Sequence, residues 1–160
     1  MQPLEDCSVF SLRSLAKSHR PCGEVYAEVL GVSPDTVKDY FVSNPLGIVS
    51  DGEIFVRTFN EIQSEGISLH CGLPEGSEIN VLKIGDIVAD TRQALDSVIT
   101  YQPAGVINFN CLYRTFEMLN NDLVQPYCAL WGRYPSIGFS TGGEAYLGHI
   151  NETSTVLVIK

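Results

Sequence analysis

Apolar residues recur at helical spacing near the start of the chain and predict two short helices there. The first spans Glu24 to Leu30 and ends at Gly31, because glycine takes the left-handed backbone conformation that closes many helices. The second begins at Ser33-Pro34-Asp35, where serine can cap the helix and proline tolerates its first position. One face of this second helix is expected to carry Val37, Tyr40 and Phe41.

The stretch from Leu46 to Ile84 predicts antiparallel strands. Asp51-Gly52 is a strong hairpin signal, and Leu73-Pro74-Glu75-Gly76 marks a further turn. Short strands separated by regular turn signals are typical of a meander. The predicted strands are Leu46–Val49, Ile54–Phe59, a segment that alternates through Ile67, Leu69 and Cys71, and Ile79–Ile84.

The second half of the chain predicts helices between strands. The longest helix is expected from Gly85-Asp86 to about Tyr101, and a second from about Leu112 to Val124. Their predicted buried positions are Ile87, Leu95, Val98 and Ile99 in the first helix, and Phe116, Leu119 and Leu123 in the second. The predicted strands are Ala104–Phe109, Ser136–Thr141, Glu144–Leu147 and Thr153–Ile159. This order predicts the α+β class: an antiparallel or mixed sheet with helices packed mainly on one face, in a single compact domain.

Composition narrows the classes of function. The chain has 160 residues, 44% of them hydrophobic, which is enough for one domain with a real core. Ten basic residues against nineteen acidic ones give a net charge of −9, so a nucleic acid would meet no basic face that could release its counterions. No apolar run approaches the length of a membrane-spanning helix, and we expect no membrane insertion.

Cysteine usage predicts a cytoplasmic location. The five cysteines are an odd and scattered set without a C-x-x-C pair, which indicates reduced thiols rather than a disulfide framework or a zinc site. No histidine has an acid or cysteine at metal-ligand spacing, so we expect neither a metal nor a cofactor. Residues 1–20 show no sustained period, and they are predicted to be an N-terminal arm or the remnant of a longer segment, with the domain over residues 21–160.

The first candidate site lies where the strand at Ala104–Phe109 gives way to a helix. The first N–H groups of a helix are unpaired and favour an anion. Asn110 is suited to cap this helix, and the pKa of the Cys111 thiol is expected to be lowered there. Arg114 can grip a carboxylate with two N–H groups. The structural alternative is a capping Asn, a small buried Cys and an Arg paired with an acid of the chain.

The second candidate site is the glycine-rich segment Gly138–Glu144. It matches the G-x-S-x-G pattern of a nucleophile elbow around Ser140, but such an elbow needs a helix after the serine, and here a short strand follows. A tight hairpin is the better interpretation, with glycines that let the backbone approach a strand or a ligand. His149 follows closely; a lone His near a turn is more often a surface group than a ligand-binding one.

These two segments and the last strand resemble the C-terminal module of the FIST family, whose name stands for F-box and intracellular signal transduction. Members show a Phe-x-Cys-x-x-Arg strand end, a Gly-Phe-Phe-Thr-x-Gly-Glu hairpin and a His-Asn-x-Thr segment before a last strand. The matching residues are Phe109, Cys111, Arg114, Gly138, Phe139, Thr141, Gly143, Glu144 and His149. Ser140 replaces the usual second Phe, and Gly142 stands where Tyr is often found. Shorter similarities extend the resemblance over about residues 23–160.

The resemblance implies an intracellular sensory domain of a signal transduction protein that binds small molecules, such as amino acids, without turnover. It implies as partners a small molecule and either the family's N-terminal module or a signalling output domain. The candidate ligand-binding residues are Asn110, Cys111, Arg114, Phe139, Thr141, Gly143, Glu144 and His149.

Arg114 and Glu144 are the charged pair on which this interpretation depends. If both face one cavity, Arg114 would hold the α-carboxylate of an amino acid and Glu144 its ammonium group. The alternative is a direct salt bridge between them, which needs no ligand.

Two other functions stay open at this point. One is a protein-interaction or scaffold domain that pairs with a missing N-terminal module or a partner chain through an open strand edge. The other is an enzyme with Cys111 or Ser140 as nucleophile, which requires His149 within hydrogen-bond reach. The sequence favours a protein without enzymatic activity.

Overall fold

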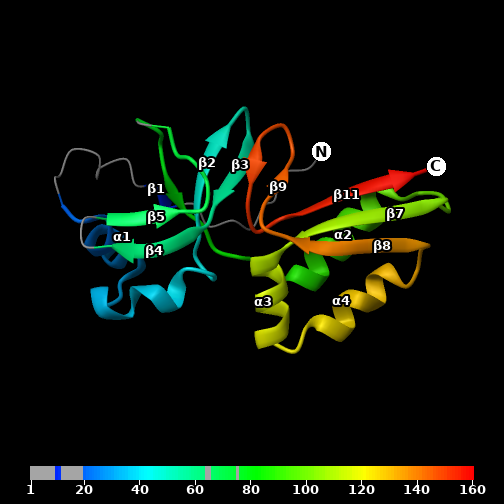
Figure 1. Cartoon of the computed structure of the whole chain (residues 1–160), viewed down its shortest axis with the longest axis horizontal. Coiled ribbons are helices and arrows are strands. Elements are labelled where there is room, and N and C mark those ends of the chain that lie inside the picture. The colour runs from blue at the N-terminus through cyan, green and yellow to red at the C-terminus, as the bar shows by residue number, and fades with distance from the viewer. Residues whose placement is uncertain (1–9, 12–19, 64–65, 75) are drawn as a thin grey trace. The chain divides into compact units, whose positions relative to one another are not determined.

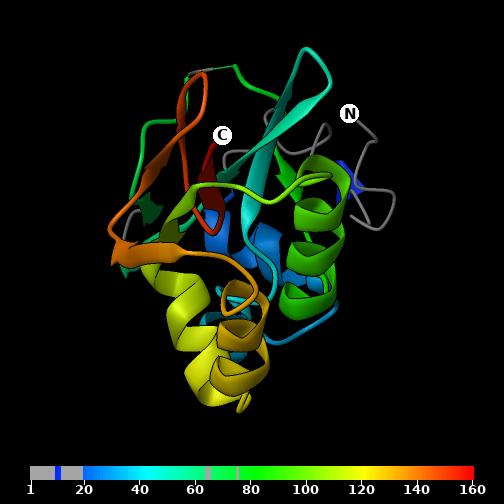
Figure 2. The same ribbon diagram turned by 90° about the vertical axis from the view of Figure 1, so that its right-hand side faces the viewer.

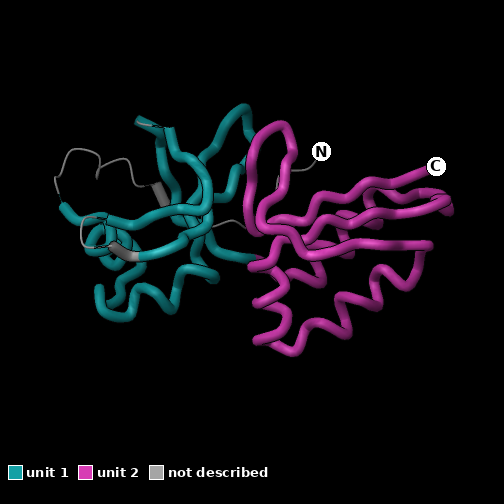
Figure 3. The backbone as a smooth tube through the Cα atoms, in the orientation of Figure 1, with its two compact units in different colours: residues 1–84 teal, residues 85–160 magenta. Residues whose placement is uncertain are grey.

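The computed structural model describes residues 10–11, 20–63, 66–74 and 76–160. Helices and short sheets follow one another along the chain (Figure 1), so the predicted α+β class is confirmed. The predicted N-terminal arm falls almost entirely outside the described residues. The chain divides into two compact units, unit 1 over Met1–Ile84 and unit 2 over Gly85–Lys160 (Figure 3). Every strand pairs within its own unit, which is why the single domain expected from the sequence contains two cores.

Unit 1 combines antiparallel strands with two short helices. Its sheets have the orders β1-β6-β2-β3 and β4-β5. Its elements are β1 (Phe10–Ser11), α1 (Cys22–Leu30), η1 (Pro34–Tyr40), β2 (Leu46–Ser50), β3 (Glu53–Arg57), β4 (Phe59–Gln63), β5 (Gly66–Leu69) and β6 (Asn80–Val81).

Local signals account for the ends of these elements. Helix α1 closes at Gly31, whose φ of 70° is left-handed. The Ser33 side chain accepts a hydrogen bond from the N–H of Asp35 at the start of η1, as predicted, although η1 is a 3-10 helix. Asp51 and Gly52 have φ values of 53° and 82°, the two positive angles that a tight hairpin between β2 and β3 requires.

The predicted meander is wrong in its strand order. Strand β6 pairs with β2, through Val81 with Leu46 and Asn80 with Gly47, and not with the preceding strand β5. Strands β4 and β5 form a separate hairpin. The reason is the core of unit 1, where strands far apart in sequence pack around α1 and η1 through Tyr26, Ala27, Val37, Leu46, Phe59 and Val81.

Unit 2 contains a mixed three-stranded sheet, a two-stranded hairpin and the remaining helices. The sheet has the order β11-β7-β8, in which β7 is antiparallel to β11 and parallel to β8. The elements are α2 (Ile87–Val98), β7 (Gly105–Cys111), α3 (Leu112–Asn120), α4 (Val124–Trp131), β8 (Ser136–Thr141), β9 (Glu144–Ala145), β10 (His149–Ile150) and β11 (Ser154–Ile159).

Two predictions about the helices of unit 2 are wrong. The helix expected up to Val124 ends at Asn120, and a second helix, α4, follows it. In consequence Phe116 and Leu119, expected to be buried, are exposed, and Met118 takes the buried position of α3. Val98, also expected in the core, is exposed on α2, whereas Ile87 and Leu95 are buried as predicted.

One face of the three-stranded sheet is covered by all three helices of unit 2 (Figure 2). Alternate residues of β7, such as Val106, point to this covered face, where α2, α3 and α4 complete a core. The register places the intervening residues of the three strands on the opposite face. We call that side the open face; its large apolar residues are Ile107, Phe109, Ile137, Phe139, Leu157 and Ile159.

Candidate functional site

The Glu144 side chain lies at the carboxyl ends of the parallel strands β7 and β8. Cys111 and Thr141, the last residues of these strands, are register partners, and Glu144 begins strand β9 directly afterwards. The Thr141 hydroxyl donates a hydrogen bond to one carboxylate oxygen of Glu144, and the Thr153 hydroxyl donates to the other at 3.2 Å. Glu144 is only 4% exposed. We call Cys111, Thr141, Glu144 and Thr153 the carboxylate cluster.

No positive charge neutralises Glu144 among the residues that the structure describes. The ion pairs found there join Arg20 to α1 and Arg133 to Asp96. A buried carboxylate is normally paired with a cation or coordinated to a metal, because transfer of its charge out of water is costly. The hydroxyl groups of the cluster offset part of that cost, and a positively charged partner would offset more.

Cys111 does not have the lowered pKa expected at a helix start. Burial raises the pKa of its thiol, backbone N–H groups at Tyr113 and Glu152 lower it in part, and the neighbouring Glu144 carboxylate raises it further. Cys111 is the N-cap residue of α3, but its thiol makes no capping hydrogen bond. The thiol is therefore a weak nucleophile at neutral pH, since the reactive form is the thiolate.

Gly143 lets two polar side chains approach the backbone beside Glu144. A Cβ atom at Gly143 would lie 2.5 Å from Nε2 of His149 and 3.4 Å from Nδ2 of Asn151. Asn151 is buried, and His149 is exposed on strand β10. A side chain at position 143 would displace the exposed imidazole of His149, so glycine allows this close approach.

Arg114 belongs to a separate hydrogen-bond network on the face of the sheet that the helices of unit 2 cover. Its Nε donates to Oδ1 of Asn110 and its Nη2 donates to Oγ1 of Thr91, both at 3.0 Å. The guanidinium carbon lies 6.0 Å from the centroid of the Tyr127 ring, within the range of a cation–π contact. Arg114 makes no ion pair within the described part of the chain.

Asn110 is the centre of this network rather than the predicted helix cap. Its Oδ1 also accepts from the Tyr127 hydroxyl at 3.1 Å, and its Nδ2 donates to the hydroxyl of Thr115 at 3.0 Å. Asn108 extends the network, because its Nδ2 donates to the Tyr127 hydroxyl at 3.1 Å. We call Thr91, Asn108, Asn110, Arg114 and Tyr127 the guanidinium network.

The structure does not bring Arg114 and Glu144 together. Successive side chains of a strand point to opposite faces, so Asn110 directs its contacts to the covered face while Cys111 contacts Glu144 on the other. The two charged groups make no ion pair, which excludes the direct salt bridge. Neither Arg114 nor Glu144 lines either of the two hollows described below.

Phe139 and Ser140 also lie on different faces. Phe139 is on the open face, where its ring meets that of Phe109 edge to face with centroids 5.4 Å apart. Ser140 is on the covered side, and its hydroxyl lies 2.7 Å from that of Thr115. This neighbour is not a base, so the hydroxyl lacks the partner that a nucleophilic serine needs.

A hollow of about 210 Å³ borders the guanidinium network in unit 2. It lies between strand β8 and helix α4, and Asn108 and Tyr127 contribute to both the hollow and the network. The indole N–H of Trp131, another lining residue, is buried without a hydrogen-bond partner. The hollow is lined by Asn108, Tyr127, Cys128, Trp131, Ser136, Ile137 and Gly138.

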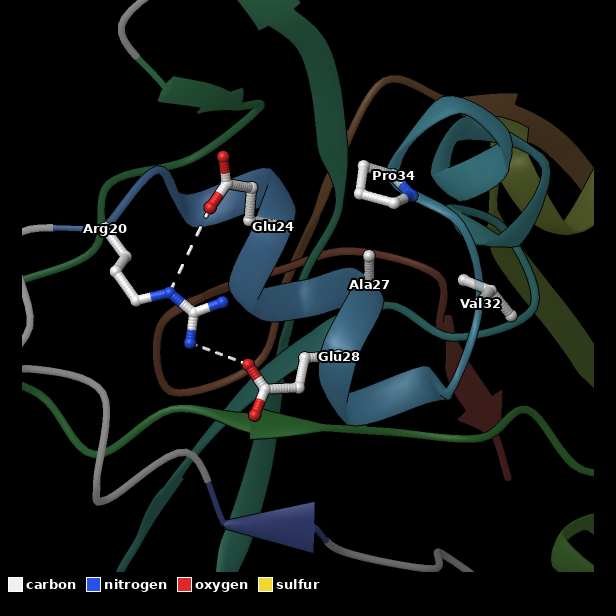
Figure 4. A pocket seen from close by; sticks show the side chains of 6 residues that line it. All are labelled: Arg20, Glu24, Ala27, Glu28, Val32 and Pro34. Atoms are coloured by element: carbon white, nitrogen blue, oxygen red, sulfur yellow. Dashed lines mark hydrogen bonds and ion pairs between the residues drawn. The ribbon is translucent and has the colours of Figure 1, made fainter.

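A second hollow, of about 320 Å³, lies in unit 1 beside α1 (Figure 4). The positive charge of Arg20, which lines this hollow, is already paired with two carboxylates. Its Nη1 lies 2.7 Å from an oxygen of Glu28, and its Nε lies 4.0 Å from an oxygen of Glu24. Its lining residues are Arg20, Glu24, Ala27, Glu28, Val32 and Pro34. None of the residues predicted to bind a ligand is among them.

The sequence analysis missed two members of the site. Thr153 is a donor to Glu144, and Asn151 lies buried against Gly143. Both belong to Asn151-Glu152-Thr153, whose pattern signals only a glycosylation sequon when it is taken alone. Its position directly before the last strand was the available signal, because β11 pairs with β7 and so carries Thr153 to the end of that strand.

The described residues contain neither a metal-binding group nor a membrane-spanning helix. No group of three or more His, Cys, Asp and Glu residues is placed to hold a metal ion. None of the helices there combines the length and the apolar character that crossing a bilayer requires.

The fold and the site define an α+β domain with two polar clusters and no metal-ligating group among its described residues. Comparison with protein families identifies it further: the sequence model of the FIST C domain matches residues 23–146. The chain therefore belongs to the FIST family, which places it among the sensory domains of signal transduction. The match crosses the boundary between units 1 and 2, so the matched segment includes part of each. No curated protein and no solved structure matches the chain.

Proposed function

We propose that this chain is a sensory domain that binds a small molecule with a positively charged amino group, such as an amino acid, and does not convert it. The observation that carries the proposal is Glu144, a buried carboxylate without a cationic partner among the described residues. An ammonium group of a ligand would supply the missing charge and form charge-assisted hydrogen bonds.

The position of Glu144 supports the same conclusion. Ligands of open sheets that contain parallel strands commonly bind beyond the carboxyl ends of those strands. Cys111 and Thr141 end such strands, and the backbone turns at Gly143 to carry Glu144 back toward them. Of the predicted ligand-binding residues, Cys111, Thr141, Gly143, Glu144 and His149 gather at this end of the sheet.

The proposal includes binding without turnover. The raised pKa of the Cys111 thiol disfavours a thiolate nucleophile, and the Ser140 hydroxyl is paired with Thr115. A role of Arg114 in binding a carboxylate stays a prediction, because its donors already bond Asn110 and Thr91. The ammonium group is therefore the part of the ligand that we assign to this site.

Thermal shift and calorimetry against a panel of matched compounds test this assignment. The panel contains free amino acids, their carboxyl amides and their N-acetyl derivatives, because only the N-acetyl derivatives lack the ammonium group. A ligand at a hundred times its Kd should stabilise the fold by about 2.7 kcal/mol. We expect free amino acids or their amides to stabilise the chain, and N-acetyl derivatives to have no effect.

Glu144→Gln supplies the variant for this experiment and Glu117→Gln its control. The first removes the negative charge with little change of shape, and the second removes a half-buried carboxylate on α3 outside the carboxylate cluster. We expect binding to be lost only in the first. Equal binding of N-acetyl derivatives, or no stabilisation by any compound of the panel, would refute the proposal.

A further inference from the structure

The open face of unit 2 leaves large apolar side chains in contact with solvent. Ile137 is 71% exposed, Phe139 61%, Leu157 54% and Ile159 43%. They stand in neighbouring strands of one sheet, so they form a continuous patch rather than scattered positions. Contiguous patches of this kind mark interaction surfaces on folded proteins.

The topology gives an independent reason to expect a cover over this face. Strands β7 and β8 are parallel, and sheets built only of parallel strands have both faces covered; in this mixed sheet the β7–β8 pair is the part to which that tendency applies. The helices of unit 2 cover only one face (Figure 2). Strand β8 is also an edge strand, and none of its residues carries a charge that would protect the edge from pairing.

The charge pattern indicates what the cover is. The chain has a net charge of −9, so two copies repel each other over most of their surface. Strands β7, β8 and β11 contain no Asp, Glu, Lys or Arg, which makes the open face a neutral area on an acidic protein. A partner selected by charge would find nothing to recognise there, whereas a second copy can dock through this face without repulsion between facing charges.

We propose that the open face is the interface of a homodimer in which two copies stack their sheets face to face. A twofold axis places the same patch on both partners, and the rows of Ile, Phe and Leu side chains then interdigitate as in a β-sandwich. Phe139 lies on β8 at one edge of the sheet, and Leu157 lies on β11 at the other edge. A second copy stacked over the whole open face would therefore cover both side chains. The proposal is independent of the ligand site at Glu144.

The size of the face sets the expected strength of the dimer. Three strands about 4.8 Å apart, each six residues of about 3.3 Å, give a footprint of roughly 300 Å² and an accessible area on the order of 500 Å². Stable interfaces bury about 800 Å² on each partner. We therefore expect a reversible dimer with a Kd roughly in the micromolar range.

Sedimentation equilibrium of the whole chain tests the proposal. Between about 1 and 300 µM, which brackets a micromolar Kd, the apparent mass should rise from the monomer value of 17.6 kDa toward twice that value. Phe139→Glu places two carboxylates in the interface and should weaken dimerisation by at least about 100-fold. Val98→Glu is the matched control, because Val98 is also 61% exposed but lies on α2, away from the open face. It should dimerise like the unmodified chain.

A second variant keeps the test decisive if Phe139→Glu does not fold. Ile137→Lys carries its charge at a position that is 71% exposed, where lysine is well tolerated on an edge strand. Circular dichroism melting confirms that each variant is folded. A chain that stays monomeric at the highest concentration would overturn the proposal, as would a dimer that folded Ile137→Lys and Phe139→Glu leave intact.

Discussion

The two faces of the sheet β11-β7-β8 differ in how their polar groups are hydrogen-bonded and in how far their apolar side chains are buried. On the covered face, Asn108, Asn110 and Arg114 are held in a network of hydrogen bonds below the helices. On the other, the carboxylate cluster stands at one end of the sheet and the apolar open face extends from it. Both sets come from the same three strands.

The difference teaches that the covered face serves stability, whereas our two proposals assign binding to the opposite face. Donors and acceptors of the guanidinium network bond one another, so a ligand would have to break existing hydrogen bonds in that network. Glu144 is buried and the open face is apolar and exposed, so our proposals give each an added partner, a cation for Glu144 and apolar surface for the open face. The two proposals above both concern this second face.

Truncation of an apolar side chain on each face should give the largest contrast. Leu130 of α4 is 3% exposed in the core under the covered face, and Leu130→Ala should cost about 2–5 kcal/mol of unfolding free energy. Ile137→Ala on the open face should cost less than about 1 kcal/mol in dilute monomer, because little is buried. Urea unfolding at low concentration measures both. Equal losses would show that the open face is covered within one copy of the chain.

Alkylation of cysteines sharpens the comparison at the ends of the strands. Cys111 is buried and the pKa of its thiol is raised, whereas Cys128 on α4 is exposed. With iodoacetamide near neutral pH, Cys111 should react at least about tenfold more slowly than Cys128. Mass spectrometry of peptides resolves the two sites.

The same experiment tests the contact between Cys111 and Glu144. The carboxylate raises the pKa of the thiol, so Glu144→Gln should lower that pKa and increase the thiolate fraction. The alkylation rate of Cys111 should then rise, because the thiolate is the form that reacts. A rate that stays constant would mean that access alone limits the reaction.

The smallest expected effect concerns Glu117, on the helix that follows β7. Burial raises the pKa of this carboxyl above its ordinary value of 4.5, although Arg114 partly opposes the shift. A raised pKa in the folded state favours the protonated form, so the group stabilises the fold below pH 4.5 relative to neutral pH. Glu117→Gln should therefore increase stability at pH 7, by less than about 0.5 kcal/mol. The gain should vanish in melts below pH 4.5, and a gain that is equal at both pH values would contradict this explanation.

The elements that the sequence predicts well are those with local signals. Asp86 caps α2 by accepting hydrogen bonds from Val88 and Ala89, Gly31 ends α1, and Asp51-Gly52 makes its hairpin. Each signal acts within four residues, and no distant contact overrides it. The strand before Cys111 was also predictable, because a continuous run of apolar residues does not suit the solvent-exposed edge of a sheet.

The elements that depend on distant contacts were not predictable in the same way. Helix α4 contains Pro126 in its first turn, where proline is tolerated, and its burial depends on packing against α2 and α3. The pairing of β6 with β2 joins segments separated in the sequence by three other strands, β3, β4 and β5. Neither feature has a signal in the nearby sequence.

The residues of the candidate site were found, but their division into two clusters was not. Asn110 and Cys111 are adjacent in sequence, and the sequence alone assigns both to one candidate site where a strand gives way to a helix. The period of two along a strand separates them, because Asn110 joins Arg114 and Cys111 joins Glu144. The alternation of side chains along a strand is a general rule. Applying it to Asn110 and Cys111 required knowing that β7 extends to Cys111, whereas the predicted strand ends at Phe109.

The parallel pairing of β7 with β8 also has a kinetic consequence. Strands β2 and β3 are joined by the short turn at Asp51-Gly52, and hairpins of this kind close in about 1–10 µs. Strand β8 can align beside β7 only after the intervening chain of α3 and α4 has folded back, a longer loop closure that slows folding. Refolding experiments should therefore detect the hairpin of unit 1 well before the assembled sheet of unit 2.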